Sequence, residues 1–459
     1  MQSWAAQELR YAQLGDARLN RRLVRLVEDL AAQPTASVPR ACGHWAATKA
    51  AYRFWGSARV KPEAIQAAHR QSTVERVRGH GTILVIQDTT DLNFTHHPAT
   101  RGLGPLDHSS QLGLKVHSAL AVSAQGVPLG LIHQEVWTRD PAAVGKRHQR
   151  RRRETKEKES QRWLTALTAS QEAVPEGIEV ITIADREADI YDLFAMPRRP
   201  GVHLLIRATH NRRVSHEARY LWPAIRQSPA RGPWTIEVQR KDDHPPRQAT
   251  LTVRYETLAI HPPRHHRRRA SLPPISVQVI LAEEENPPPG VKPISWLLLT
   301  TWPVTTFEEA LQCVRWYRDR WLVERYHFVL KSGCRVEELQ LEESARIRRA
   351  LATYCIVAWR LLWLTYEARQ NPDSPCDRAL ETHEWQALYC TIHKTPIPPA
   401  TPPTLHEAVR WVAQLGGFLG RKHDGEPGVK SIWRGLRRLE DIAATWKLLH
   451  SNPSAIVDT

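Results

Sequence analysis

Four polar side chains recur at regular intervals in the stretch YRDRWLVERYHFVLK, which runs from Tyr317 to Lys331. Counting from Tyr317, the other three are Arg320, Glu324 and Lys331, which follow after 3, 7 and 14 residues. An α-helix turns by about 100° per residue, so these positions fall within roughly 60° of one another. One helix face would then carry a carboxylate between two cations. The simpler interpretation is an ion pair between Arg320 and Glu324, worth about 0.3 kcal/mol on an isolated helix.

The residues around this stripe are apolar. Those predicted to lie opposite it or to one side are Leu311, Val314, Leu322 and Val329, and then Trp316, Val323 and Leu330. A polar stripe on a helix with apolar flanks is expected to face a site rather than open water.

Two aspartates follow apolar, β-branched runs. Asp88 ends TILVIQD (82–88) and Asp185 ends IEVITIAD (178–185). A carboxylate at a buried strand end is costly without a compensating cation, and two neighbouring carboxylates raise each other's pKa. With Glu324 they form a set of three acids, and such a set selects a hard ion, Mg²⁺ or Mn²⁺. Two such ions would suit phosphodiester chemistry.

The charge of the chain favours a polyanionic partner. It holds 64 Lys and Arg against 48 Asp and Glu in 459 residues, a formal net charge of +16. Nucleic acid is the usual partner of such an excess, although a large surface can also carry it for solubility alone. The six Cys form no C-x-x-C pair, and the longest apolar run, YCIVAWRLLWL, is interrupted by Arg360. We therefore expect no zinc finger, no membrane segment and a cytoplasmic, nucleoid-associated location.

The order of predicted elements indicates an α/β fold. Strands are expected at 82–88, 115–126, 128–138, 178–185 and 202–209, with helices at 157–173 and after Asp185. The order β-β-β-α-β-α-β is that of an RNase H-like mixed five-stranded sheet with helices on both faces.

Three domains are expected from the composition. Residues 1–70 read as a helical, Arg-rich DNA-binding domain, and residues 71–369 as the catalytic domain. A mostly β insertion at about 210–305 interrupts the latter, with strands at 233–240, 247–260, 275–284 and 293–301. One continuous helix over 307–331 follows it, then a second over 345–369. Residues 370–459 are expected to form a helical dimerisation region.

The pattern Y-x2-R-x3-E-x6-K resembles the YREK signature of bacterial insertion-sequence DDE transposases of the IS-four family, which includes the transposase of transposon Tn-five. Further segments occur in the order found in that family, and the resemblance extends from about residue 14 to 450. They are LGDARLNRRLV, KAAYRFW, IQDTT, GLIHQEVW, ADREADI, LAEEENPPPG, ISWLLLT and LGGF.

The resemblance implies a reaction. Asp88, Asp185 and Glu324 would be the catalytic, metal-binding triad, with two Mg²⁺ or Mn²⁺ ions per active site. The enzyme would carry out cut-and-paste transposition: hydrolysis at the transposon end, hairpin formation and resolution, then strand transfer into target DNA. Its partners would be double-stranded DNA, both the terminal inverted repeats and the target, and a second copy of the chain in a synaptic homodimer.

The resemblance also implies DNA contacts. Trp296 would receive a flipped base, while Tyr317, Arg320 and Lys331 would hold the nearby phosphate. The remaining contacts implied are Arg207, after the fifth strand, and Arg22 and Arg53, at the transposon end. The loop QPTASVPRACG departs from the loop of better-known relatives, so the base sequence of the transposon end cannot be inferred from the resemblance. The alternatives are a nuclease of the same fold without strand transfer and a non-catalytic DNA-binding repressor.

Overall fold

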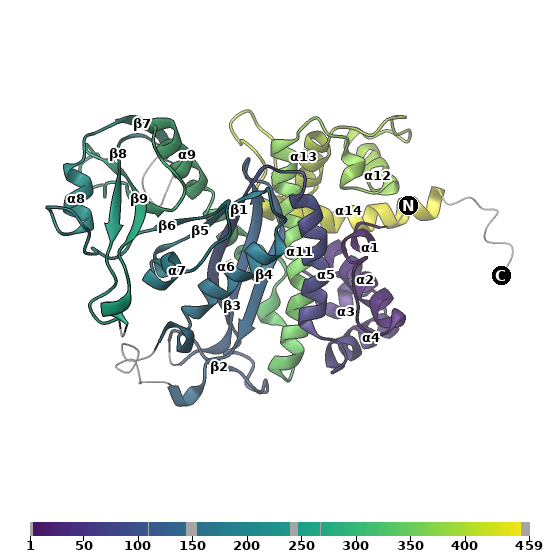
Figure 1. Cartoon of the computed structure of the whole chain (residues 1–459). Helices are drawn as coiled ribbons and strands as arrows, with labels where there is room; N and C mark the ends of the chain where they lie inside the picture. The colour runs from purple at the N-terminus through teal and green to yellow at the C-terminus, as the bar shows by residue number, and fades with distance from the viewer. Residues whose placement is uncertain (1–2, 109, 144–153, 239–246, 267, 451–459) are drawn as a thin grey trace.

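The protein is built around one large mixed sheet, shown in the centre and left of Figure 1. The computed structural model describes residues 3–108, 110–143, 154–238, 247–266 and 268–450. In these residues the sheet has ten strands, in the order β2-β3-β1-β5-β6-β10-β9-β8-β7, with β4 paired to β3. Their bounds are β1 Thr82–Asn93, β2 Gly104–Pro105, β3 Leu112–Ser123, β4 Pro128–Trp137, β5 Glu179–Ala184, β6 Val202–Arg207, β7 Gly232–Val238, β8 Arg247–Ile260, β9 Ile275–Glu284 and β10 Ser295–Thr300.

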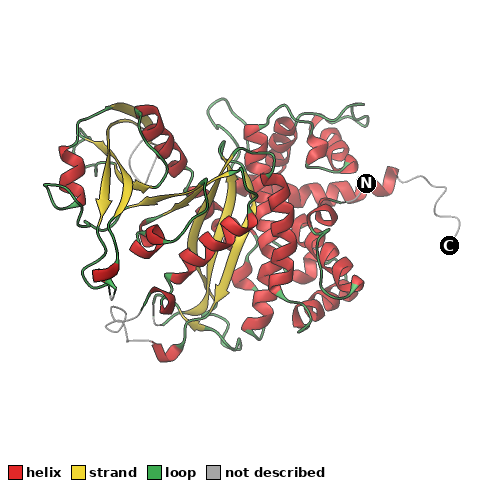
Figure 2. Cartoon of the chain, in the orientation of Figure 1, coloured by secondary structure: helices red, strands yellow, loops and turns green. Residues whose placement is uncertain are grey.

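The rest of the regular structure in the described chain is helical, and most of the helices gather on the right-hand side of Figure 2. Their bounds are α1 Trp4–Glu8, α2 Ala17–Ala32, α3 Val38–Ala41, α4 Trp45–Gly56, α5 Pro62–Val77, α6 Gln161–Ala173, α7 Tyr191–Ala195, α8 Leu221–Gln227, α9 Phe307–Arg318, α10 Trp321–Phe328, α11 Ser344–Gln370, α12 Thr382–His393, α13 Leu405–Leu415 and α14 Val429–His450. No helix in the described ranges is long and apolar enough to cross a bilayer.

The five strands predicted for the core are present and form a mixed sheet. β3 pairs antiparallel with both β4 and β1, and β1, β5 and β6 run parallel to one another. The first strand is longer than predicted, because β1 continues past Asp88 to Asn93. Its antiparallel pairing with β3 extends to Asn93, whereas its parallel pairing with β5 stops at Ile86.

The predicted five-stranded sheet is too small. β10 pairs antiparallel with β6, and β9, β8 and β7 follow it outward, so the strands of the predicted insertion extend the same sheet. The expectation of a strand over 233–240 holds as far as Val238, and its last two residues lie outside the described part. An unpaired edge at β6 would have left backbone groups without partners, and β10 supplies them.

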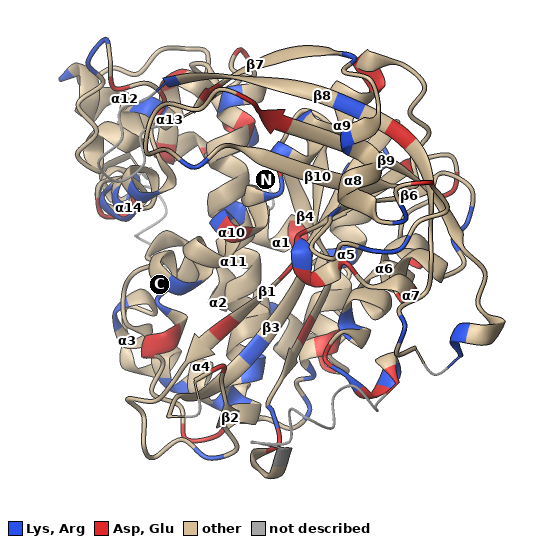
Figure 3. Cartoon of the chain, turned by 90° about the vertical axis from the view of Figure 1, so that its left-hand side faces the viewer, with Lys and Arg blue, Asp and Glu red and all other residues tan. Residues whose placement is uncertain are grey.

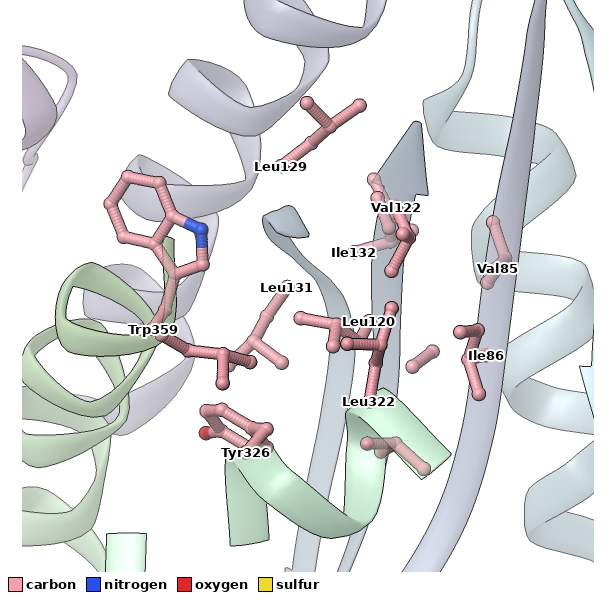
Figure 4. Packing of buried hydrophobic residues seen from close by; sticks show 14 of the residues in the cluster. Val85, Ile86, Leu120, Val122, Leu129, Leu131, Ile132, Leu322, Tyr326 and Trp359 are labelled. Carbon is pink, nitrogen blue, oxygen red and sulfur yellow. The ribbon is translucent and has the colours of Figure 1, made fainter. Parts of the chain in front are cut away.

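Helices cover both faces of the sheet, and two neighbouring residues of β3 show this. His117 packs edge-on against Trp163 of α6, with ring centroids 4.7 Å apart. The next residue, Ser118, contacts His327 of α10, with Oγ 3.2 Å from Nε2. Successive strand side chains point to opposite faces, so α6 and α10 lie on opposite sides. Figure 4 shows the apolar cluster on the α10 side, where Ile86, Leu120 and Leu322 meet.

The continuous helix predicted over 307–331 is interrupted. α9 ends at Arg318, α10 begins at Trp321, and a π-helical turn covers Val329–Gly333. At the junction the amides of Asp319 and Arg320 bond back three residues instead of four, which tightens the turn. The prediction that all four polar side chains share one straight helix face was therefore wrong. It assumed a rotation of about 100° per residue from Tyr317 to Lys331, and the tight turn and the π-helical turn both change that rotation.

The N-terminal helices are fixed to the edge of the sheet by buried polar contacts. His69 of α5 approaches Glu8 of α1, with Nδ1 2.6 Å from Oε1, and its Nε2 accepts a hydrogen bond of 2.9 Å from the Leu131 amide in β4. α5 also passes very close to Gly130 (φ +144°), where any Cβ would lie 2.0 Å from Thr73 Oγ1. Glycine is favoured there because a Cβ would overlap the Thr73 side chain and because other residues rarely adopt this positive φ.

Candidate active site

Asp88 and Asp185 lie level with each other on neighbouring parallel strands. Ile86 of β1 pairs with Ile183 of β5, and each aspartate comes two residues later. Since residues two apart on a strand share a face, both carboxylates point to the side of the sheet that α10 covers. The strand partner of Asp88 on β3 is Ser118. Ser118 contacts His327 of α10, so Asp88 also points to the α10 side of the sheet.

The charge on Asp88 is poorly compensated. Burial, and then the nearby Asp185 carboxylate, raise the pKa of Asp88 to about 7, although the Thr89 amide donates to it at 2.9 Å. Arg320 opposes this rise and Glu324 adds to it, so both side chains lie within electrostatic reach of Asp88. A strongly raised carboxylate pKa at the edge of a sheet is typical of a functional site.

Asp185 begins a short 3₁₀ turn, Arg186–Ala188, and its Oδ1 accepts a hydrogen bond of 2.8 Å from the Glu187 amide. The end of this turn is held by a buried ion pair, in which Arg212 Nη2 lies 2.6 Å from Asp189 Oδ1. Asp189 also accepts hydrogen bonds from the backbone amides after β6. The segment that carries Asp185 is thus fixed to the next parallel strand.

Glu324 lies in the first turn of α10 and forms a close ion pair with Arg320, four residues earlier. Its side chain is 55% exposed, which differs from the enclosed position that the apolar flanks predicted. The structure therefore brings Glu324 to the rim of the Asp88 and Asp185 site, with its charge partly neutralised by Arg320. Figure 3 shows acidic and basic positions together on α10, which packs against β1.

An aromatic and basic group lies beside these acids. Trp296 of β10 packs edge-on against Tyr317 of α9, with ring centroids 6.3 Å apart. The Tyr317 hydroxyl is buried and has no partner that meets hydrogen-bond geometry among the described residues. Burial raises the pKa of Tyr317, and the guanidinium groups of Arg320 and Arg207 lie close enough to oppose that rise. Arg207 is half-buried and donates to the Ser295 carbonyl at 3.1 Å. Tyr317, Trp296, Arg207 and Arg320 are thus brought together.

Lys331 lies further along β1 than these residues. Its Nζ donates to the Asp91 carbonyl at 2.9 Å and lies 3.5 Å from Glu337 Oε1. Because Asp91 is three residues beyond Asp88, Lys331 flanks the acid pair on the side toward the end of β1.

Two predicted DNA contacts lie elsewhere. Arg22 of α2 is half-buried and Arg53 of α4 is exposed, and both belong to the N-terminal helices rather than to the cluster around Asp88.

The site also contains a residue that the sequence reasoning missed. His327 Nδ1 lies 3.9 Å from Asp88 Oδ2 and its Nε2 contacts Ser118. Burial, and then Lys331, lower the pKa of His327 to about 3, so the imidazole is neutral. Behind it, Gln134 Nε2 donates to both Ser118 Oγ and the Tyr326 hydroxyl at 3.1 Å. The available signal was spacing: His327 follows Glu324 by three residues and so lies on nearly the same helix face.

The donor set fits a hard divalent ion in part. Asp88 and Asp185 offer carboxylate oxygens at one sheet edge, and Asp185 lies close enough to raise the pKa of Asp88. Mg²⁺ and Mn²⁺ favour such oxygen ligands. In the described residues no three acidic, His or Cys side chains are close enough together to hold an ion. Glu324 must therefore turn from Arg320 toward the aspartates before all three could share one.

Comparison with protein families divides the chain into three matched regions. Residues 1–60 match a transposase DNA-binding family, and residues 152–360 match the transposase DDE domain. Residues 356–448 match the transposase Tn5 dimerisation domain. Asp185 and Glu324 fall inside the DDE match. Asp88 lies in the unmatched segment before it, so its place in the site follows from the pairing of β1 with β5 alone.

The mixed sheet, the acids at its edge and these matches define a DDE transposase, whose catalytic domain has an RNase H-like fold. The chain belongs to the IS-four family of transposases and is similar to that of Tn5, with a DNA-binding domain at one end and a dimerisation domain at the other. Enzymes of this class generally use divalent metal ions.

Proposed function

We propose that this transposase moves its element by a cut-and-paste route with a hairpin intermediate, and that Asp88, Asp185 and Glu324 are its catalytic acids. The observation that carries the proposal is the level placement of Asp88 and Asp185 on parallel strands, with Glu324 at the rim of the same site. Two Mg²⁺ or Mn²⁺ ions on these carboxylates would activate an attacking oxygen and stabilise the leaving oxygen.

The DNA chemistry proposed has four steps, each exchanging one phosphorus–oxygen bond for another. Water attacks the phosphodiester at the transposon end and releases a 3′-OH. That hydroxyl attacks the opposite strand, which closes a hairpin on the transposon end and frees the flanking DNA. Water then opens the hairpin. The restored 3′-OH finally attacks a phosphodiester of target DNA, so no covalent bond to the protein is needed.

The aromatic and basic group next to the acids suits the hairpin step. A tight hairpin forces one base out of the stack, at a cost of a few kcal/mol, and an aromatic surface can receive it. Trp296 is half-buried and lies against Tyr317, next to Arg207 and Arg320. We assign Trp296 as the base receiver and Tyr317, Arg207, Arg320 and Lys331 as groups that hold the phosphates beside it.

The outer domains supply the remaining parts of the proposal. Arg22 and Arg53 in the DNA-binding match would contact the terminal inverted repeat, while the dimerisation match would join two copies so that both transposon ends are held in one synaptic complex. Phosphate contacts from such cations position DNA without reading its sequence.

The deciding experiment is a strand-transfer assay with Mg²⁺ and duplexes taken from the DNA that borders the reading frame. We expect a hairpin product, then joined target DNA, and loss of both with Asp88→Ala. Cleavage without any joined product would favour the nuclease without strand transfer. Specific binding without cleavage by the unaltered protein would favour the non-catalytic repressor. The Asp140→Ala variant, which removes an exposed acid in the loop after β4, should behave like the unaltered protein.

A further inference from the structure

Trp45 is an unusual tryptophan in this protein. It is the first residue of α4 in the DNA-binding domain and is 76% exposed, whereas every other described tryptophan is buried or partly buried. Among the described residues no ring or guanidinium group packs on its indole, and its N–H has no hydrogen-bond partner. A single exposed apolar side chain does not by itself mark a binding site, so the residues that surround this ring are decisive.

The exposed face of α4 carries charge of one sign next to this ring. Lys49 and Arg53 follow Trp45 after four and eight residues, so the three side chains form one stripe along the helix. All three are exposed, while Ala47, Thr48, Ala51, Phe54 and Trp55 on the other side are buried. Neither Lys49 nor Arg53 has a carboxylate partner in the described part of the chain.

A second basic stripe lies next to the first. Helix α2 packs against α4 and exposes Arg18, Arg21 and Arg25, which recur at helical spacing. The two helices meet near Trp45: Asp29 of α2 lies within electrostatic reach of both Arg22 and His44, and His44 directly precedes Trp45. Trp45 therefore projects beside a surface of arginines and a lysine, whose natural complement is a polyphosphate backbone.

We propose that Trp45 contacts a base of the transposon end and helps to set which end sequence is bound. The proposal rests on the function proposed above, in which residues 1–60 bind that end. Cations can bind phosphates of any sequence, whereas an indole could offer a phosphate only its single N–H and presents an otherwise apolar ring. The apolar feature that a duplex offers in its major groove is the thymine methyl group. The structure thus assigns the cations to positioning and Trp45 to reading a T·A pair.

The test is a binding scan with the full chain and no divalent metal, so that cutting plays no part. Every base pair of the end duplex is substituted in turn, and the dissociation constant is measured for the unaltered protein and for Trp45→Ala. We expect Trp45→Ala to lose about tenfold in affinity for the native end and to become indifferent to substitution at one T·A pair. Replacing that thymine by uracil should weaken the unaltered protein similarly and leave Trp45→Ala unchanged.

Two matched variants complete the test. Lys49→Ala should weaken binding to native and scrambled duplexes alike, because it removes a phosphate contact. Ile397→Ala removes a side chain that is 75% exposed in the loop before α13 and should change neither.

The proposal is overturned if Trp45→Ala binds all duplexes like the unaltered protein, weakens them all equally, or alters only self-association in sedimentation. It is also overturned if the uracil substitution has no effect. If instead the unaltered protein fails to distinguish native from scrambled ends, it is the proposed function that fails.

Discussion

His327 and Asp88 face each other across the packing of α10 on the sheet, with His327 Nδ1 3.9 Å from Asp88 Oδ2. The far nitrogen of the ring contacts Ser118, and Ser118 is the strand partner of Asp88. The imidazole is therefore hydrogen-bonded to β3 at one nitrogen and lies close to the Asp88 carboxylate of β1 at the other. The imidazole is neutral, so it does not cancel the charge of the Asp88 carboxylate. Its bulk limits where that carboxylate can lie.

Replacing His327 by Ala should lower the rate of end cleavage about 10- to 100-fold, the range seen when groups that orient metal ligands are removed. Stability should fall by about 1–3 kcal/mol because buried polar atoms lose a partner. The measurements are single-turnover cleavage and denaturant unfolding. His327→Gln, which can still reach Ser118, should recover much of the rate. If His327→Ala and His327→Gln lose the same rate at equal stability, His327 does not position the Asp88 carboxylate.

Asp88→Asn should abolish cleavage and yet stabilise the metal-free protein at pH 7. The folded pKa of Asp88 is about 7 against an ordinary value of 3.8, so between these values the folded state binds more protons than the unfolded state. Stability therefore decreases as pH rises through this window, by up to about 4 kcal/mol at 1.36 kcal/mol per pKa unit. Unfolding between pH 4 and 8 should show this slope in the unaltered protein and a flatter one in Asp88→Asn. Asp140→Asn, at an exposed acid, should keep the original slope.

Glu324→Gln should separate catalysis from folding. The side chain is more than half exposed and its pair with Arg320 has i,i+4 spacing, so we expect a stability change of only about 0.5 kcal/mol. Cleavage should fall by about 10²- to 10³-fold, because the third carboxylate is lost; this is the effect of removing one essential electrostatic group. Glu172→Gln, at an exposed position of α6, provides the control for both measurements. Retained cleavage in Glu324→Gln would contradict its assignment to the triad.

Arg212→Ala should destabilise the protein by about 3–5 kcal/mol, since it leaves Asp189 buried without its partner. The turn after Asp185 ends at Asp189, so cleavage should also fall at temperatures where the variant stays folded. Arg213→Ala, at the exposed neighbouring position, should leave both thermal unfolding and cleavage unchanged. A normally stable Arg212→Ala variant would show that the ion pair does not hold the segment.

Lys331→Ala should weaken binding of end DNA and reduce the slope of log K against log salt by about one, as expected for one lost phosphate contact. Binding measured between 50 and 300 mM salt, a range of about sixfold over which such slopes are resolved, provides the check. Lys430→Ala, an exposed lysine of α14, is the comparison. If the slope is unchanged, Lys331 serves only to hold the Asp91 carbonyl and Glu337.

The sequence by itself determined the types and order of the elements around the site. Apolar, β-branched runs ending on Asp88 and Asp185 predicted strands, and β1 and β5 are there, because a short apolar run is a local property of the chain. The insertion strands were predicted for the same reason. Their joining of the core sheet was not, since hydrogen bonds between β10 and β6 link segments about ninety residues apart.

Only the tertiary structure decided how the acids are arranged. The register that sets Asp88 level with Asp185 depends on pairing between strands, and the tight turn at Asp319 and Arg320 breaks the straight face that helical spacing predicted. Exposure of Glu324 and the approach of His327 to Asp88 arise from how α10 lies on the sheet. A sequence specifies which residues a strand or helix carries, but distances between such elements come from packing, which no local pattern encodes.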